Sequence, residues 1–496
     1  MGARYGDARR ASANGCRAPV NVPSYEFLGF AAVVAVLINI HSRAGWRRAV
    51  LLGANLIFFF LLARDPRQLI PFWGLLILGF LAVKIMERRK SRIAFVVALI
   101  LIIATFITFK RYVFVPHTLL LPMPYVIIGM SYVFFRILHL VIDAYQDALP
   151  DNVDPVSYIN YTLNFTALVA GPIQFYQDYR RTESQEPAPL DGKAIARAIE
   201  RIISGFFKVS VISAALLLAQ QMTLHALTSN PALAQQIAYG ALLLSIFPVY
   251  LYFNFSGYMD FVIGAARFLR LELPENFNRP FLAVGVIDFW TRWHMTLSNW
   301  LKTYVYSPLL LSCMRRFPSR VVQRYCGVLA YFVTFFLVGA WHGQTEKFLV
   351  FGLLTGLGIS LNKAYELLLE HRLGGKRYLS LTANELYLSV SRGLNFTWFS
   401  FTMLWFWSSP QQLREIVLFL GVPAVAAAFA SLWAAATVVL SVIKAFEGVS
   451  DASETTRKFL ASPYLRTIWY TTLATLTISV TVALNTPGPH IVYRAF

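Results

Sequence analysis

Residues Val209–Met259 read VSVISAALLLAQQMTLHALTSNPALAQQIAYGALLLSIFPVYLYFNFSGYM and contain no Asp, Glu, Lys or Arg. A helix needs about 20 apolar residues to cross the hydrocarbon core of a bilayer, so this run is too long for one crossing. Ser229-Asn230-Pro231 interrupts it with residues that favour turns. The stretch therefore predicts two membrane helices joined as a hairpin.

Other apolar segments extend this pattern over most of the chain. Three further runs also lack charged residues, namely Ile93–Phe109, Tyr325–Thr345 and Ile416–Ile443. With the remaining apolar windows, the sequence predicts an all-α, polytopic membrane protein of roughly 11 to 13 membrane segments, re-entrant helices among them. Those windows are Glu26–Ile40, Ala49–Ala63, Gln68–Val83, Thr118–Ile142, Val156–Pro172, Phe348–Asn362, Leu394–Ser408 and Thr467–Leu484.

Composition agrees with a membrane protein of one domain. Of the 496 residues, 57% are hydrophobic and only 14% are charged, against about 25% charged residues in ordinary soluble domains. No soluble block of domain length interrupts the apolar segments. We therefore expect a polar extension at 1–23 without a cleavable signal peptide, a transmembrane domain at 24–484 and a tail at 485–496.

The formal charge of +19 is explained by membrane topology, and we expect no nucleic-acid partner. Basic residues gather in short loops between apolar segments, as they do on the cytoplasmic side of membrane proteins. Counting alternate loops favours a cytoplasmic location for the first two basic loops and an outside N-terminus. The basic groups are Arg43/Arg47/Arg48, Arg88/Arg89/Lys90/Arg92 and Arg315/Arg316/Arg320/Arg324.

Polar residues inside apolar segments are functional candidates, because lipid cannot solvate them. Their densest cluster spans 254–308, and its second half has the spacing of an amphipathic helix with a tryptophan face and an Asp288–Arg292 pair. His294 borders that face. It is either part of a wet cavity or an interfacial histidine that hydrogen-bonds a neighbour.

A second cluster, GAWHG at Gly339–Gly343, ends the apolar segment that begins near Tyr325. Neutral imidazole accepts a proton near physiological pH, so His342 could act as a general base towards a hydroxyl. The alternative is a buried histidine satisfied by a carbonyl group. The histidine and cysteine spacings match no metal motif, and we expect no metal site. The other histidines, His139 included, are interpreted mainly as structural.

Several ordered motifs together resemble the membrane-bound O-acyltransferase family, in particular its bacterial branch of teichoic-acid D-alanylation and alginate O-acetylation proteins. The resemblance covers the chain from about Ser24 to its end. It rests on SYEFL (Ser24–Leu28), LVAGPIQFYQDY (Leu168–Tyr179), GFFKVSVIS (Gly205–Ser213), PENFNRPF (Pro274–Phe281), DFWTRWHMTLSNWL (Asp288–Leu301) and GAWHG.

The resemblance implies a fold around a central tunnel and assigns roles to single residues. It makes His342 the principal catalytic residue, with His294 lining the same cavity. On this reading Trp293 and Trp341 shape the cavity, while Asn276 and Arg292 orient neighbours or substrate. Asn254 departs from the family, since many relatives carry an acid there, and no role for that acid transfers.

The tail Ile491–Phe496 resembles the ending of the bacterial branch, where a tyrosine is a plausible acyl relay. Tyr493 would then receive the acyl group at His342 and pass it to a partner enzyme. Ile491 and Arg494 stand where the family pattern has Phe. An ordinary amphipathic tail is the alternative.

These observations lead to one expected function and two alternatives. We expect an O-acyltransferase of the bacterial inner membrane that moves a small acyl group, most simply acetyl, towards an extracytoplasmic polysaccharide. The donor would be a cytoplasmic thioester, acetyl-CoA or an acyl carrier protein, and no cofactor would be bound. Expected partners are membrane lipid and an esterase-like (SGNH) acyltransferase or polysaccharide synthase complex. The alternatives are a transporter or flippase and a scaffold without catalysis.

Overall fold

The computed structural model describes residues 22–63, 65–121, 125–126, 128–185, 189–229, 231–452 and 462–484. In these residues the secondary structure is helical, apart from one isolated antiparallel β-bridge between Phe277 and Trp293. The all-α architecture expected from the sequence is therefore confirmed.

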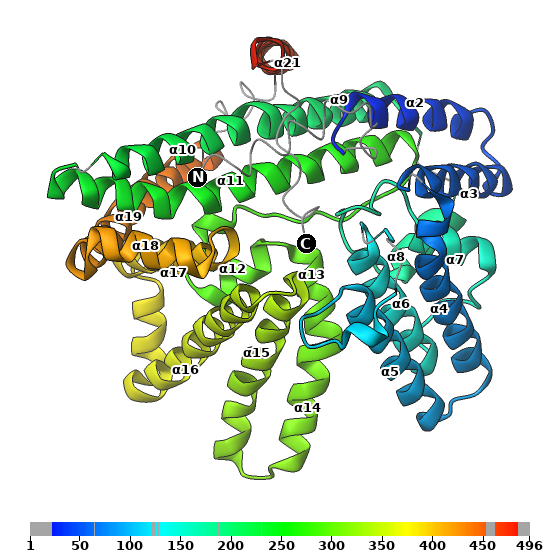
Figure 1. Cartoon of the computed structure of the whole chain (residues 1–496), viewed down its shortest axis with the longest axis horizontal. Coiled ribbons are helices and arrows are strands. Elements are labelled where there is room, and N and C mark those ends of the chain that lie inside the picture. Colours follow the sequence, from blue (N-terminus) through cyan, green and yellow to red (C-terminus); the bar gives the residue numbers. More distant parts are fainter. Residues whose placement is uncertain are drawn as a thin grey trace.

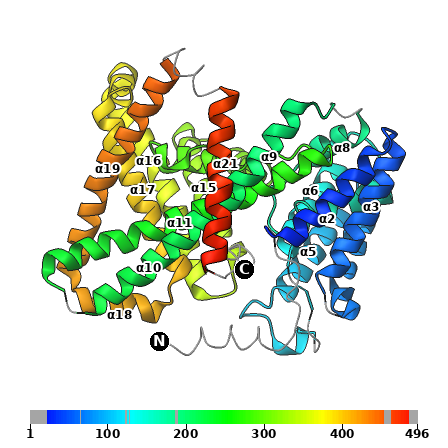
Figure 2. The ribbon, with the colours of Figure 1, turned by 90° about the horizontal axis from the view of Figure 1, so that it is seen from above.

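Helices α2 to α8 form one side of the molecule and α17 to α19 the other, with α9 to α11 running between the two sides (Figure 1). Viewed from above, α21 crosses α9 near the middle of the molecule (Figure 2). The helices are α2 (Tyr25–Asn39), α3 (Ala44–Leu61), α4 (Ile70–Arg88), α5 (Arg92–Phe109), α6 (Met130–Tyr145), α7 (Pro155–Thr162), α8 (Tyr176–Ser184), α9 (Gly192–Phe207), α10 (Ser213–Thr228), α11 (Leu233–Phe268), α12 (Val286–Arg292), α13 (Met295–Leu301), α14 (Ser307–Arg316), α15 (Arg320–His342), α16 (Glu346–Thr382), α17 (Glu385–Trp407), α18 (Pro410–Leu420), α19 (Val422–Ala452) and α21 (Pro463–Leu484).

The hairpin predicted from the uncharged run is present as α10 and α11. The first helix ends at Thr228 and the second begins at Leu233, so the break between them agrees with the one predicted from the sequence. The long α11 also packs closely against α9: a Cβ atom on Gly205 would lie 2.6 Å from the Gly257 carbonyl oxygen. Small residues at these positions allow the two backbones to approach.

Eight helices in the described part of the chain are long and apolar enough to cross a membrane. Three of the expected segments differ from the sequence prediction. The run Ile416–Ile443 is divided between α18 and α19 at Gly421, which has a positive φ of 75°. In the segment expected at Thr118–Ile142 the α-helix begins only at Met130, after Gly129 in a left-handed conformation (φ 80°). The helix expected over Val156–Pro172 is wrong, because α7 ends at Thr162.

A buried arginine explains why the chain after α7 can leave the helical conformation. Arg136 is 2% exposed, and its guanidinium donates to the Thr162 carbonyl at 2.9 Å and to the Ala167 carbonyl at 3.0 Å. The Phe165 N–H donates to Asn55 Oδ1 at 2.8 Å. Irregular backbone at membrane depth is tolerated where protein groups satisfy it. Hydropathy alone could not reveal these bonds.

Candidate active site

The segment expected to be one amphipathic helix after Pro280 is broken at His294, and that prediction is wrong. Helix α12 ends at Arg292, α13 begins at Met295, and His294 between them is left-handed (φ 46°). The break pairs with an extended stretch before α12: Asn278 N donates to the Arg292 carbonyl at 2.9 Å, and Met295 N donates to the Asn276 carbonyl at 3.0 Å. A periodicity argument cannot detect this non-local pairing. The predicted Asp288–Arg292 ion pair is confirmed, at 2.8 Å.

The break brings His294 against Asn276. The His294 Nδ1 atom lies 3.2 Å from Asn276 Oδ1, which also accepts from the Thr296 N–H at 3.1 Å and the Thr296 hydroxyl at 2.9 Å. Because an amide oxygen can only accept hydrogen bonds, the proton of the His294 ring is assigned to Nδ1. The Nε2 atom of His294 then carries the lone pair. His294 and Asn276 are 0% and 1% exposed.

His342 is the last residue of α15, where that helix turns back into α16. The two helices pack closely near this turn, since a Cβ atom on Gly339 would lie 2.3 Å from the Gly352 Cα. The imidazole is 3% exposed and packs edge-on against Phe406, with ring centroids 5.1 Å apart, and against Phe351 at 5.7 Å. Aromatic rings therefore hold the side chain in place.

The two motif histidines lie within electrostatic reach of each other, although 48 positions separate them. The charge of Lys110 also reaches the His342 ring. Lys110 follows α5, is 2% exposed, and forms no ion pair with a described carboxylate. Tyr112, two residues later, donates its hydroxyl to the Ala340 carbonyl at 2.7 Å, which joins this segment to the GAWHG motif.

Sequence reasoning did not select Lys110. Its signal was a lone basic residue directly after an uncharged apolar run, a position that usually indicates a helix end at the membrane surface. Only the fold reveals that this helix end meets the His342 motif.

The other expected site residues lie around this centre. Trp341 contacts Phe135 of α6, with ring centroids 5.3 Å apart, while Trp293 stacks on Phe289 at 5.6 Å. Arg292 is committed to Asp288 and is about one third exposed. Tyr493 lies outside the described residues. No group of three or more potential metal-ligating side chains gathers within the described part of the chain.

A second polar centre, built on His139, supports the site from one side. The Tyr176 N–H donates to His139 Nε2 at 2.8 Å, so Nδ1 carries the proton and donates to the Tyr304 hydroxyl oxygen. Tyr304 donates in turn to Asp143 at 2.9 Å. These bonds hold the segment in which the Ile173 N–H donates to Thr296 Oγ1 at 3.1 Å. The structural role expected for His139 is consistent with these bonds.

The fold and site are those of a multi-pass membrane protein with two buried histidines in one centre. A sequence profile of the membrane-bound O-acyltransferase family matches residues 144–373, which include both histidines. Over these 230 of the 496 residues, the chain is similar to the membrane-bound O-acyltransferases.

Three relatives illustrate the range of the family. The chain is 29% identical to the teichoic acid D-alanyltransferase of Bacillus subtilis (strain 168), over 56% of this chain and 70% of the relative. It is 30% identical to a probable alginate O-acetylase of Azotobacter vinelandii, over 51% and 46% of the two chains. It is 32% identical to the peptidoglycan O-acetyltransferase of Helicobacter pylori (strain ATCC 700392 / 26695), over 42% and 38%. The match thus spans less than half of the last two relatives.

Proposed function

We propose that this protein transfers a small acyl group, acetyl, from a cytoplasmic thioester donor towards hydroxyl groups of an extracytoplasmic polysaccharide. The observation that carries the proposal is the meeting of His294 and His342, from separate segments, in one buried centre among membrane helices. The names of the relatives, which act on alginate, peptidoglycan and teichoic acid, support a cell-envelope polymer as the final acceptor.

In this proposal His342 is the general base. An alcohol has a pKa far above 7, so it needs a base within hydrogen-bond reach as its oxygen attacks the thioester carbonyl carbon. The hydroxyl proton passes to the His342 imidazole, and the carbonyl oxygen becomes an oxyanion. Collapse of the intermediate breaks the carbon–sulfur bond, and the leaving thiolate takes the proton back from His342.

His294 and Lys110 are proposed to support that reaction in different ways. Asn276 leaves the His294 Nε2 atom as an acceptor, which suits a group that orients the attacking hydroxyl. The Lys110 ammonium is proposed to stabilise the oxyanion. A buried cation in a dry site is effective there, because little water screens its charge.

We further propose that the protein resides in a bacterial inner membrane and works with an esterase-like acyltransferase or a polysaccharide synthase complex outside. Tyr493 is the proposed relay in that transfer. Acetyl is preferred over D-alanyl because two of the three relatives described above carry O-acetylation in their names, whereas one carries D-alanylation.

The direct test is acyl transfer by purified protein in lipid nanodiscs supplied with radiolabelled acetyl thioester and an alcohol acceptor. Transfer by the wild type and its loss in His342→Ala would support the proposal. Transport of a solute without any covalent transfer would instead favour the transporter alternative. If the wild-type protein becomes labelled with radioactive acetyl and the Tyr493→Phe protein does not, the relay by Tyr493 is supported. Equal labelling of the two proteins would exclude it.

A further inference from the structure

Four charged side chains, contributed by α9, the turn after it, α11 and the stretch before α12, form an ion network. Arg201 of α9 lies at its middle. The guanidinium of Arg201 donates to both carboxylate oxygens of Glu275, and its Nε atom donates to Asp260 Oδ1 at 3.0 Å. Lys208 donates to the other oxygen of Asp260 at 2.6 Å. Two cations and two acids are joined, so the network has no net charge.

The spacing along α9 places both cations of this network on one face. Arg201 and Lys208 are seven residues apart, about two helical turns, and Gly205 lies between them on the same face. On α11, Gly257 precedes Asp260 by three residues, and a Cβ atom on Gly257 would lie 2.8 Å from the Lys208 Cβ. The close approach of α9 and α11 at the two glycines therefore lets one carboxylate reach both cations.

The network lies on helices that are long enough to cross a membrane, and it is partly withdrawn from water. The Arg201 and Asp260 side chains are each 17% exposed, and the Lys208 side chain is 26% exposed. Removal of one partner from such a pair is costly, because the other charge is left uncompensated. Ionisable groups in membrane segments are functional candidates. The acyl transfer proposed above makes no direct use of these charges, so their contribution lies in what they hold in place.

Glu275 connects the network to the histidine centre, because it directly precedes Asn276 in the extended stretch before α12. Successive side chains of an extended chain point to opposite sides. The Glu275 carboxylate accordingly reaches Arg201, whereas the Asn276 amide oxygen lies 3.2 Å from His294 Nδ1. The Asn276 carbonyl also accepts from the Met295 N–H at 3.0 Å. A shift of this stretch would therefore move both the ring partner of His294 and the backbone that follows it.

The same stretch is held at two further points by backbone groups. Near its start, Gln174 donates to the Glu272 carbonyl at 2.8 Å. Near its end, the Asn278 N–H donates to the Arg292 carbonyl at 2.9 Å. Between these two points, Arg201 supplies the anchor from α9. A bidentate pair between guanidinium and carboxylate fixes direction as well as distance, so this anchor also sets the angle at which Glu275 leaves the chain.

We propose that Arg201 is a positioning residue for acyl transfer. By holding Glu275 it sets the place of Asn276, which in turn keeps the His294 ring in its working orientation. The inference rests on the proposed function, in which the Nε2 atom of His294 orients the attacking hydroxyl. It gives a shared role to the motifs GFFKVSVIS and PENFNRPF, which carry Lys208 and Glu275.

The first measurement is kcat/KM for acetyl transfer in nanodiscs by Glu275→Gln, a change at an exposed side chain that the fold should tolerate. The value should fall roughly tenfold, since a small displacement of an orienting group slows a reaction strongly. Arg201→Gln should give the same loss, and Arg201→Lys should recover part of it. Glu200→Gln, which removes the neighbouring ion pair between α9 and Arg466 of α21, should keep the wild-type rate. A wild-type rate in Glu275→Gln would overturn the inference.

A double-mutant cycle separates positioning from a general weakening of the fold. Because Glu275 is proposed to act through Asn276, Glu275→Gln should cause no further loss of kcat/KM in an Asn276→Ala background, where the orienting amide is already absent. Losses that multiply would mean that the two residues act independently, and this result would overturn the inference.

The state of the His294 ring provides a readout that needs no acyl transfer, and it separates this inference from the proposed function. In nanodisc protein labelled with ¹⁵N-histidine, the His294 signal is identified by its absence from His294→Gln. The wild type should show a proton on Nδ1, and in Glu275→Gln that signal should shift, because the ring loses its fixed partner. Such a shift would support the inference even if the wild type transferred no acetyl. An unchanged His294 signal in Glu275→Gln would overturn it, whatever the activity.

Discussion

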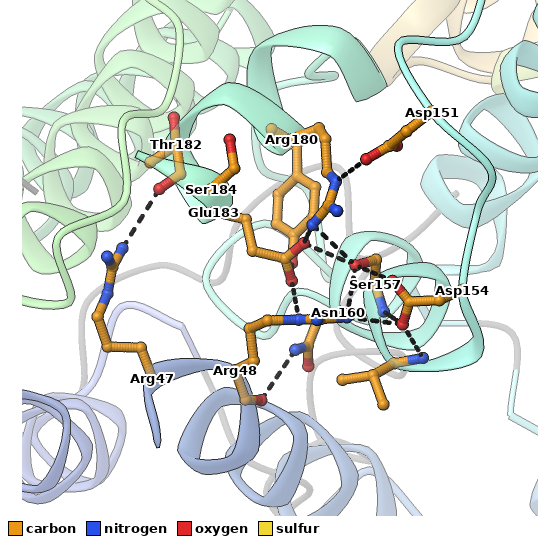
Figure 3. Close-up of polar contacts among 12 residues, drawn as sticks. Arg47, Arg48, Asp151, Asp154, Ser157, Asn160, Arg180, Thr182, Glu183 and Ser184 are labelled. Carbon is orange, nitrogen blue, oxygen red and sulfur yellow. Dashed lines mark hydrogen bonds and ion pairs between the residues drawn. The ribbon is translucent and has the colours of Figure 1, made fainter. Parts of the chain in front are cut away.

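The histidine centre and the α3–α7–α8 charge network treat polar groups in opposite ways. In the centre, a few polar side chains lie among aromatic rings, and each has specific partners, as His294 has in Asn276. In the network, Arg48 pairs with Asp154 and Arg180 pairs with Glu183, so acids and bases neutralise one another (Figure 3). The contrast teaches that charge density does not indicate the active site of a membrane protein. The few polar groups in an apolar environment do, because each is costly to place there.

The largest effect should come from His342. His342→Ala should lower the acyl-transfer rate by roughly 10² to 10⁴-fold, the usual contribution of a general base, with normal protein abundance in the membrane. His371→Ala, an exposed histidine on α16, is the matched control and should retain activity. A His342→Ala protein with wild-type turnover would contradict the role of His342 as the general base and, with it, the functional difference between the histidine centre and the charge network.

Lys110 should give the next largest effect. Lys110→Met should lower kcat by roughly 10²-fold with little change in KM, because a donor to the oxyanion acts mainly in the transition state. Lys84→Met, which removes a lysine that pairs with Glu87, is the control.

The pH profile provides a sharper test of the same residue. Burial lowers the pKa of Lys110 to about 8. Activity should therefore fall as pH rises through about 8, because the ammonium form is lost. In Lys110→Arg this decline should move to higher pH, since guanidinium stays charged. An unmoved alkaline decline would exclude Lys110 from the reaction.

Asn276→Ala should have a smaller effect on activity. It removes the acceptor that fixes the His294 ring and leaves the buried Thr296 donors unsatisfied, at a cost of about 1–3 kcal/mol. We expect a roughly 10- to 100-fold lower rate, measured as kcat/KM in nanodiscs. Asn278→Ala, at an exposed position two residues away, should behave like the wild type.

Tyr304→Phe should affect stability rather than chemistry. It breaks the bridge between His139 and Asp143 and should cost about 1 kcal/mol, seen as a Tm lower by a few degrees. Tyr325→Phe, at an exposed tyrosine, serves as the control. A rate loss larger than the stability loss would mean that the His139 centre takes part in the reaction.

The smallest effect should come from acid acting on the charge network. Partial burial raises the pKa of Asp154. Hydrogen bonds from Ser157 and the charge of Arg48 lower it by more, so the pKa lies below the usual value. A lowered carboxyl pKa contributes stability that is present above about pH 4 and is lost as pH falls through the folded-state pKa. Asp154→Asn should remove that part of the acid dependence. The expected change is under about 1 kcal/mol, because the pair is partly exposed.

Much of the site could be predicted from the sequence, through local signals. His294 and His342 stood out as polar residues in apolar surroundings, and the Ser-Asn-Pro break located the α10–α11 hairpin correctly. The single amphipathic helix after Pro280 was a wrong prediction because a non-local pairing with Asn276 and Asn278 outweighs the helical periodicity. Lys110 was missed for a related reason, since its position beside His342 depends on segments that are distant in the chain.

The sequence by itself determined that the chain is a membrane protein and where most of its long helices lie, because transfer of apolar side chains out of water depends on composition and period. Tertiary structure alone decided which polar groups meet. It brought Lys110 towards His342 and turned His294 onto Asn276. The reason is that hydrogen bonds and charges act over a few ångströms in space, whereas sequence patterns report only neighbours along the chain.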